Sequence, residues 1–163
     1  MVMRRRAEGR LIVEQTSDRE LVRSMLSAAA MVADGIGWPP ACYLVAWFGN
    51  DPVGVVGVET GVNAALLRSL LVVEPMRRRG IGVELITAAR KAAHTRGART
   101  LYAVSTEAGE YLQRFGFEPA SIDELVEALR GAPQVEYYLA RPDELSREVA
   151  WRLDISRDGV IIR

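Results

Sequence analysis

The chain has 163 residues, a length that predicts a single domain over 1–163, and 49% of them are hydrophobic, enough to bury a sizeable core. Its 21 basic and 21 acidic residues give a formal net charge of zero, which argues against nucleic acid or an anionic membrane as a partner. Cys42 is the only cysteine, which excludes an intrachain disulfide and a cysteine-based metal site, and we expect no metal.

The N-terminal residues and the hydropathy of the chain predict a cytoplasmic protein. The basic start is followed by no apolar stretch of signal-peptide length, so residues 1–9 are expected to be a disordered end. No window holds 18 consecutive apolar residues, so no membrane span is expected. A reducing cytoplasm follows as the expected compartment.

The first third of the chain predicts a strand, a helix and a loop. Residues 10–15 favour a short strand, and the run after Asp18 has apolar residues at helical spacing. Glycine and proline at 35–40 end that helix in a loop, where Trp38 either contacts substrate or packs over the core. Composition and turn residues then predict an antiparallel meander of three strands, at 42–48, 53–60 and 65–73.

The centre of the chain, residues 66–93, predicts a buried strand, a tight basic turn and a long amphipathic helix. Backbone N–H groups at a helix start have no intrahelical partner, and the helix dipole also favours an anion there. Gly80 and Gly82 allow a phosphate to approach the backbone, and the arginines at 77–79 add positive potential. This turn therefore predicts a pyrophosphate site. Because the helix is a right-handed crossover, the next strand, 100–106, should lie parallel to the previous one.

The elements after residue 106 complete the expected fold. They are helices at 107–114 and 121–130, a strand at 135–139, a helical turn at 142–148 and a last strand at 149–155. Together the elements predict an α+β (α/β) protein with a mixed, mostly antiparallel central sheet flanked by helices. The expected parallel pair of strands lies around the crossover helix 80–97.

Two motifs in this order resemble the GNAT superfamily of N-acetyltransferases. Arg77, Gly80 and Gly82 fill the family's Arg/Gln-x-x-Gly-x-Gly/Ala motif for acetyl-CoA, which follows a strand. The segment from Ala108 to Phe117 is similar to the later motif that ends in Gly-Phe. The resemblance covers about residues 10–119 and implies the GNAT fold. It also implies direct transfer of acetyl from acetyl-CoA to a primary amine, with no covalent enzyme intermediate.

A shorter match concerns one branch of the superfamily. Residues 65–70, preceded by Gly57-Val58-Glu59, look like the branch that acetylates arsinothricin, phosphinothricin and related amino-acid-like compounds. Ser105-Thr106 is similar to the paired hydroxyl residues of that branch. This likeness implies a small, amino-acid-like acceptor.

The resemblance also implies roles for individual cofactor residues. Leu71, Val72 and Val73 would offer backbone groups to the pantetheine arm and the thioester carbonyl. Ser105 stands where the family often has an asparagine that contacts the cofactor. The residues around the pyrophosphate would be Arg78, Arg79, Gly80, Ile81, Gly82 and Val83.

Tyr111 is the candidate acid for the leaving thiolate, but its position departs from the family pattern. The family's usual tyrosine is four residues before the glycine of the Gly-Phe pair, and here that residue is Leu112. One helical step turns a side chain by about 100°. Tyr111 therefore either donates the proton or points into the core. Loss of the acid need not abolish activity, because water can protonate the thiolate.

Glu59 and Arg68 are the candidate catalytic and substrate-binding residues. Glu59 is expected near the end of the strand that faces the cofactor strand, where a carboxylate could take the ammonium proton through water. Arg68 is on a central strand, where it could hold a substrate carboxylate. The alternative for both is a structural salt bridge. His94, late in the crossover helix, is expected on the surface.

Three functions remain open at this point. The preferred one is acetyl-CoA-dependent N-acetylation of a small primary amine. The second is acetylation of a protein N-terminus or a lysine, which nothing in the sequence decides. The third is a catalytically silent acyl-CoA-binding sensor, which Leu112 keeps open. A homodimer through the C-terminal strands is compatible with the sequence.

Overall fold

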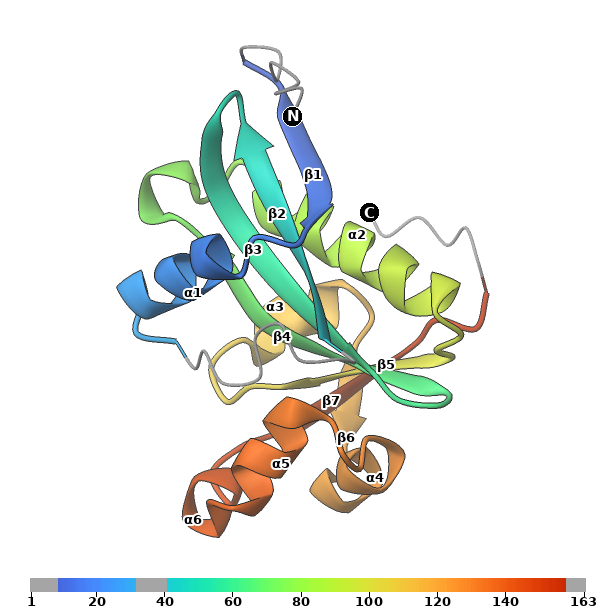
Figure 1. The fold of residues 1–163 in the computed structure, drawn as a ribbon. Coiled ribbons are helices and arrows are strands. Elements are labelled where there is room, and N and C mark those ends of the chain that lie inside the picture. The colour runs from blue at the N-terminus through green and yellow to red at the C-terminus, as the bar shows by residue number, and fades with distance from the viewer. Residues whose placement is uncertain (1–8, 32–40, 158–163) are drawn as a thin grey trace.

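A computed structural model describes residues 9–31 and 41–157 of the chain. One seven-stranded sheet, in the order β1-β2-β3-β4-β5-β7-β6, runs through the described part, with helices on both faces (Figure 1). The predicted loop with Trp38, and residues 1–8 of the expected disordered end, lie outside the described residues. The elements are β1 (Leu11–Thr16), α1 (Arg19–Ala28), β2 (Ala41–Phe48), β3 (Asp51–Thr60), β4 (Ala64–Val72), the 3-10 helix η1 (Glu74–Met76), α2 (Ile81–Thr95), β5 (Thr100–Val104), α3 (Gly109–Arg114), β6 (Glu118–Ala120), α4 (Ile122–Ala128), α5 (Pro133–Leu139), α6 (Pro142–Leu145) and β7 (Ala150–Asp154).

The predicted meander and crossover are confirmed. Strands β2, β3 and β4 pair antiparallel in sequence order, and β1 adds to β2. After the crossover through α2, β5 pairs parallel to β4. Helix α2 stops where the sequence predicts, because Gly97 adopts a left-handed φ of 92° just after the Arg96 cap. The mixed, mostly antiparallel sheet is therefore the one expected.

The C-terminal third differs from the prediction in two elements. The segment predicted as a strand at 135–139 is part of helix α5, which begins with Pro133 in its first turn and buries Val135. A short apolar run has no periodicity that separates strand from helix, and the favourable N-terminal proline is the signal that decides. The predicted last strand is β7, and it lies between β5 and the unpredicted β6.

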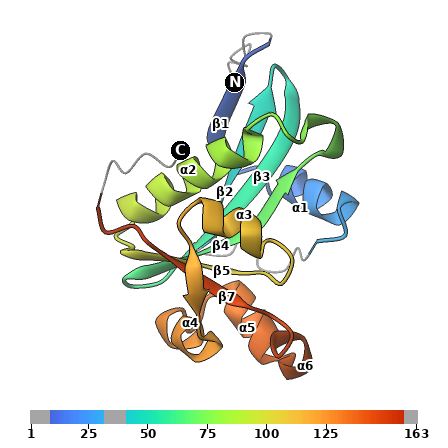
Figure 2. The same cartoon turned by 180° about the vertical axis from the view of Figure 1, so that it is seen from behind.

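Two layers of helices bury the two faces of the sheet. Helices α2 and α3 cover one face, which Figure 2 shows from the front, and α2 buries Leu85, Ile86 and Ala89 there. Helix α1 packs Val22 and Leu26 on the opposite face. Helices α4 and α5 contribute to a third cluster of buried residues, which lies against β5. These layers fix β4 and the start of α2 relative to each other.

Strand β4 changes course in its second half. Its parallel pairing with β5 runs only from Ala64 to Leu67. Its antiparallel register with β3 then shifts by one residue: Gly57 pairs with Arg68, whereas Val55 pairs with Leu71. Ser69, inside this bulge, has a left-handed φ of 56°. A bulge bends its strand, so β4 turns away from β5 and a gap opens between them.

Candidate active site

The turn before α2 has the geometry that the sequence predicts for an anion site. Gly80 caps the helix with a left-handed φ of 78°, a conformation that glycine adopts without strain. Arg78 also has a left-handed backbone conformation, with a φ of 65°. The chain therefore reverses within a few residues, and the first N–H groups of a helix of 15 residues face outward with its positive dipole end.

A cavity of about 750 Å³ lies between this turn, β4 and α3. It places the cofactor strand and the phosphate turn on one continuous surface. Arg79 and Val73, which the sequence also assigned to the cofactor, are not among its lining residues. The predicted cofactor residues that line it are Leu71, Val72, Arg78, Gly80, Ile81, Gly82 and Val83.

The backbone of β4 supplies polar groups to this cavity. The Val73 N–H donates to the Val53 carbonyl at 2.9 Å, so Val73 faces β3. Because successive residues of a strand point their backbone groups to opposite sides, Val72 faces away from β3, toward the cavity. The Val72 carbonyl accepts a bond from Arg77 Nε at 3.0 Å, which the sequence did not indicate. The Val72 N–H, on the same side, is a candidate donor to a thioester oxygen.

The Tyr111 side chain lines the cavity, and the side chain of its neighbour Leu112 packs into the core. Leu112 is 3% exposed and belongs to the main core cluster. The half-buried Tyr111 ring packs edge-on against Phe115, with ring centroids 5.0 Å apart. Its hydroxyl lies over Gly82, where any Cβ would collide with it. Burial raises the pKa of Tyr111, which Arg114 partly offsets, so the phenol keeps its proton at neutral pH.

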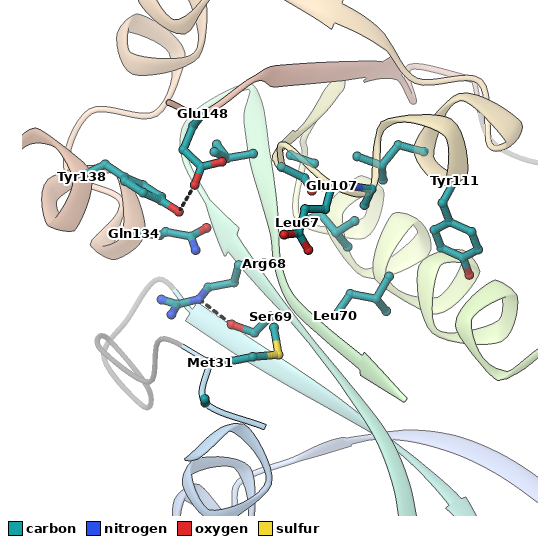
Figure 3. A pocket seen from close by; sticks show the side chains of 16 residues that line it. Met31, Leu67, Arg68, Ser69, Leu70, Glu107, Tyr111, Gln134, Tyr138 and Glu148 are labelled. Carbon is teal, nitrogen blue, oxygen red and sulfur yellow. Dashed lines mark hydrogen bonds between the residues drawn. The ribbon is translucent and has the colours of Figure 1, made fainter. Parts of the chain in front are cut away.

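A second cavity, of about 510 Å³, adjoins the first. Figure 3 shows it between β4, α5 and the loop after β5. The residues that line both cavities, and so mark their junction, are Met31, Leu70, Ala108 and Tyr111. Leu70 and Met31 were not predicted as site residues. Leu70 belongs to the segment 65–70 that resembles one branch of the family, and no motif includes Met31. The two cavities together form one continuous site. We call the larger cavity the cofactor side and the smaller one the acceptor side, after the roles that are proposed for them below.

Ser105 belongs to the acceptor side, not to the phosphate turn. It lines the second cavity, and its hydroxyl accepts the Ala108 N–H at 2.9 Å. Its carbonyl accepts Trp151 Nε1 at 3.0 Å. These bonds hold the loop that leads into α3. The Ser105 hydroxyl is thus bonded to the backbone of Ala108, and its contact with the cofactor stays a prediction.

Glu59 and Arg68 form the salt bridge that the sequence allowed as an alternative. Arg68 Nη1 donates to Glu59 Oε2 at 2.8 Å, and both side chains are fully buried. The Gln134 N–H donates to the other Glu59 oxygen at 2.9 Å, and Arg68 Nε donates to Ser69 Oγ at 3.0 Å. Arg68 lines the second cavity and Glu59 lines neither. The role of Glu59 as base stays a prediction.

Two carboxylates that the sequence did not indicate line the acceptor side. Glu107 is in the loop after β5, and Glu148 precedes β7. Tyr138, on α5, donates its hydroxyl to Glu148 Oε1 at 3.3 Å (Figure 3). Burial, and secondly the Glu148 charge, raise the pKa of Tyr138 to about 12. No motif pointed to these residues, because they meet only when the C-terminal segment folds over the sheet.

Other candidate features lie apart from this site. His94 is half-buried, not on the surface, and its Nδ1 is 2.9 Å from the Ile155 carbonyl. Within residues 9–31 and 41–157, no group of three histidine, cysteine or acidic side chains is placed to hold a metal ion. In that same part of the chain, no helix is long and apolar enough to cross a membrane.

The model of the acetyltransferase (GNAT) family matches residues 14–117, which is more than half of the chain. The chain belongs to this family. No curated protein matches it by sequence. Family membership agrees with a strand, a glycine turn and a Gly-Phe motif in the expected order.

Solved structures of other proteins share the fold at low sequence identity. N-acetylglutamate synthase from Neisseria gonorrhoeae, complexed with coenzyme A and N-acetyl-glutamate, has a TM-score of 0.70 and 16% identity over 93% of this chain. This chain spans only 36% of that protein. A Bacillus subtilis acetyltransferase in complex with CoA has a TM-score of 0.63 and 18% identity, covering 89% of this chain and 99% of its own. At these identities the likeness concerns the fold alone.

Proposed function

We propose that this GNAT family member transfers acetyl from acetyl-CoA to a primary amine of a small molecule. The observation that carries the proposal is the pair of adjoining cavities at the splayed end of β4. One contains the glycine turn at the start of α2, and the other contains charged side chains suited to an acceptor. The cavities meet at Leu70 and Tyr111, so a thioester and an amine can approach each other there.

The residues of the larger cavity fit a CoA pyrophosphate. Gly80 has no Cβ and no neighbouring atom over it, so it leaves the backbone at the start of α2 open, and Arg78 adds a positive charge beside it. The Val72 N–H lies along the way to the junction. Bound CoA in the Bacillus and Neisseria proteins supports the same co-substrate here.

The proposed reaction is a direct acyl transfer. The nitrogen lone pair forms a bond to the acetyl carbon, the carbon–sulfur bond breaks, and the sulfur leaves as a thiolate that takes up one proton. The amine meanwhile loses one proton. A preset donor such as the Val72 N–H would stabilise the oxyanion, an effect of about 3 kcal/mol where measured in other enzymes.

Two residues are proposed for the proton transfers. Tyr111 would protonate the thiolate, because it lines both cavities at their junction and keeps its proton at neutral pH. Its hydroxyl lies over Gly82, so this role requires the side chain to turn toward the sulfur. Glu59 would accept the ammonium proton through water, as the sequence predicts. Both of its oxygens already accept bonds, from Arg68 and Gln134, and the side chain is fully buried, so that role requires water to reach a remaining lone pair.

The acceptor is proposed to be a small amine, with an amino-acid-like molecule as the prediction from sequence. That finer prediction, and the arsinothricin/phosphinothricin branch with it, would have Arg68 hold a carboxylate. Arg68 is already bonded to Glu59 and Ser69, so a carboxylate would have to compete with them. A cytoplasmic location and a homodimer through the C-terminal strands remain predictions.

The test is an acetyl-CoA assay that follows thiol release with a panel of amino acids, polyamines and phosphinothricin-type compounds. We expect release with at least one small amine, together with acetylation of that amine detected by mass spectrometry. No release with any of them, despite micromolar binding of acetyl-CoA, would favour the sensor function. Release only with peptides would favour acetylation of a protein N-terminus or lysine.

A further inference from the structure

The acceptor cavity carries an excess of negative charge. Its lining includes the carboxylates of Glu107 and Glu148, and Arg68 is its only cationic residue within the described chain. The charge of Arg68 is balanced by Glu59, whose Oε2 lies 2.8 Å from Nη1 in a fully buried pair. Two carboxylates therefore determine the potential that an incoming acceptor meets.

Glu148 is at the wall opposite the cofactor. Figure 3 shows Tyr138, Gln134 and Glu148 together on the α5 side, with Tyr111 at the other side next to α2. Tyr111 is one of the residues at the junction of the two cavities, where the acetyl group would be transferred. An acceptor whose amine reaches the junction therefore extends toward Glu148.

The Tyr138–Glu148 pair is arranged to bind a cation. The Tyr138 hydroxyl donates to Oε1 of Glu148 at 3.3 Å, and this bond orients the carboxylate. The second oxygen can accept a bond from a ligand N–H. The side chain of Glu148 is half-buried, so its charge is screened less than that of an exposed carboxylate.

We propose that the acceptor carries a second cationic group, an ammonium or guanidinium, which Glu148 binds while the primary amine reacts at the cavity junction. The inference rests on the proposed function and names the acceptor class for the same site. A neutral tail lacks this ion pair, and a carboxylate tail at this position is repelled by Glu148.

Three acceptors with the same number of carbons test the proposal: pentane-1,5-diamine, pentylamine and 5-aminopentanoate. Their far ends are an ammonium, a methyl group and a carboxylate. We expect kcat/KM for the diamine to exceed that for pentylamine by about 10-fold or more, since hydrogen bonds to charged groups contribute at this level. We expect 5-aminopentanoate to be the poorest of the three. Thiol release and mass spectrometry measure all of them.

Substitutions assign the effect to Glu148. In Glu148→Gln we expect the diamine-to-pentylamine ratio to fall toward one, and in Tyr138→Phe to fall part of the way, since the carboxylate remains but is less oriented. Glu144→Gln is the matched control. Glu144 also accepts a tyrosine hydroxyl, from Tyr137 at 3.4 Å, but it is exposed and outside the cavity, so the ratio should not change.

The outcomes separate this inference from the proposed function. Equal rates for the three acceptors, a preference for 5-aminopentanoate, or an unchanged ratio in both Glu148→Gln and Tyr138→Phe would overturn the inference and leave the acetyltransferase proposal standing. No acetylation of any amine would overturn both. Calorimetry with the diamine and the protein saturated with CoA gives a second measurement. Binding that Glu148→Gln weakens about 10-fold would support the inference.

Discussion

Replacing Glu59 by glutamine tests whether this residue holds the fold or performs the chemistry. The two oxygens of Glu59 accept bonds from Arg68 Nη1 and from the Gln134 N–H. A glutamine has one oxygen and one NH2 group, so in either orientation a donor faces another donor. The guanidinium also loses the negative charge of Glu59, while its side chain remains fully buried.

The expected loss of stability is large. Removing one partner of a buried ion pair typically costs about 3–5 kcal/mol, because the other charge remains without compensation. A single domain has a total free energy of unfolding of about 5–15 kcal/mol. At this chain length, each kcal/mol lowers the melting temperature by roughly 2–4 °C. We therefore expect Glu59→Gln to melt about 6–20 °C below the wild type, measured by circular dichroism with urea unfolding as a second probe.

Glu118→Gln is the matched control. Glu118 pairs with Arg152 at a similar distance of 2.9 Å, but its side chain is 62% exposed. Exposed pairs contribute about 0–1 kcal/mol, so this variant should melt within a few degrees of the wild type. Equal losses in the two variants would refute the reasoning from burial. A Glu59→Gln protein with wild-type stability and lost turnover would instead identify Glu59 as the base.

Three further predictions concern the cofactor turn, the acid and a helix cap. Gly82→Asp should abolish acetyl-CoA binding in calorimetry, because it places a carboxylate at the pyrophosphate and displaces Tyr111. The control Thr87→Asp, on the same helix but outside the cofactor cavity, should still bind acetyl-CoA. Binding by Gly82→Asp would mean that the phosphates are held elsewhere. Tyr111→Phe should lower kcat more than cofactor affinity. Burial raises the pKa of Tyr111 above its ordinary value, so the phenol form persists through neutral pH. A wild-type rate that falls between about pH 7 and 9, with no such fall in Tyr111→Phe, would contradict the assignment of this protonated phenol as the acid. Ser121→Ala removes the hydroxyl that accepts the Glu124 N–H at 3.0 Å at the start of α4, and it should destabilise the protein by about 1 kcal/mol in urea unfolding, with no such loss in Ser121→Asp.

The cofactor side of the site was largely predictable from sequence, because its signals are local. The phosphate turn needs glycine at Gly80 for a left-handed φ and at Gly82 for space, and both residues are visible in the chain itself. The periodic apolar residues of α2 and the strand before it fix the direction of the turn. The assignment of Val73 to the cavity could not be checked locally, since its N–H direction depends on pairing with Val53 in the neighbouring strand.

Several features had no local signal. Ser69 adopts a left-handed φ that serine rarely adopts, and only the registers with β3 and β5 show that β4 bends there. The direction of Tyr111 depended on the packing of α3, which buries its neighbour Leu112. The apolar residues of α5 fit either a strand or a helix until their partners were known.

The sequence by itself determined the order of β2, β3, β4 and β5, the crossover helix and the place of the pyrophosphate turn, because these depend on residue period, glycine positions and neighbours in the chain. Only the tertiary structure decided which charges the acceptor meets. Arg68, Glu107 and Glu148 come from distant parts of the chain, and the burial of Arg68 against Glu59 depends on strand pairing. Side chains brought together by long-range packing leave no spacing in the sequence from which their charge balance could be read.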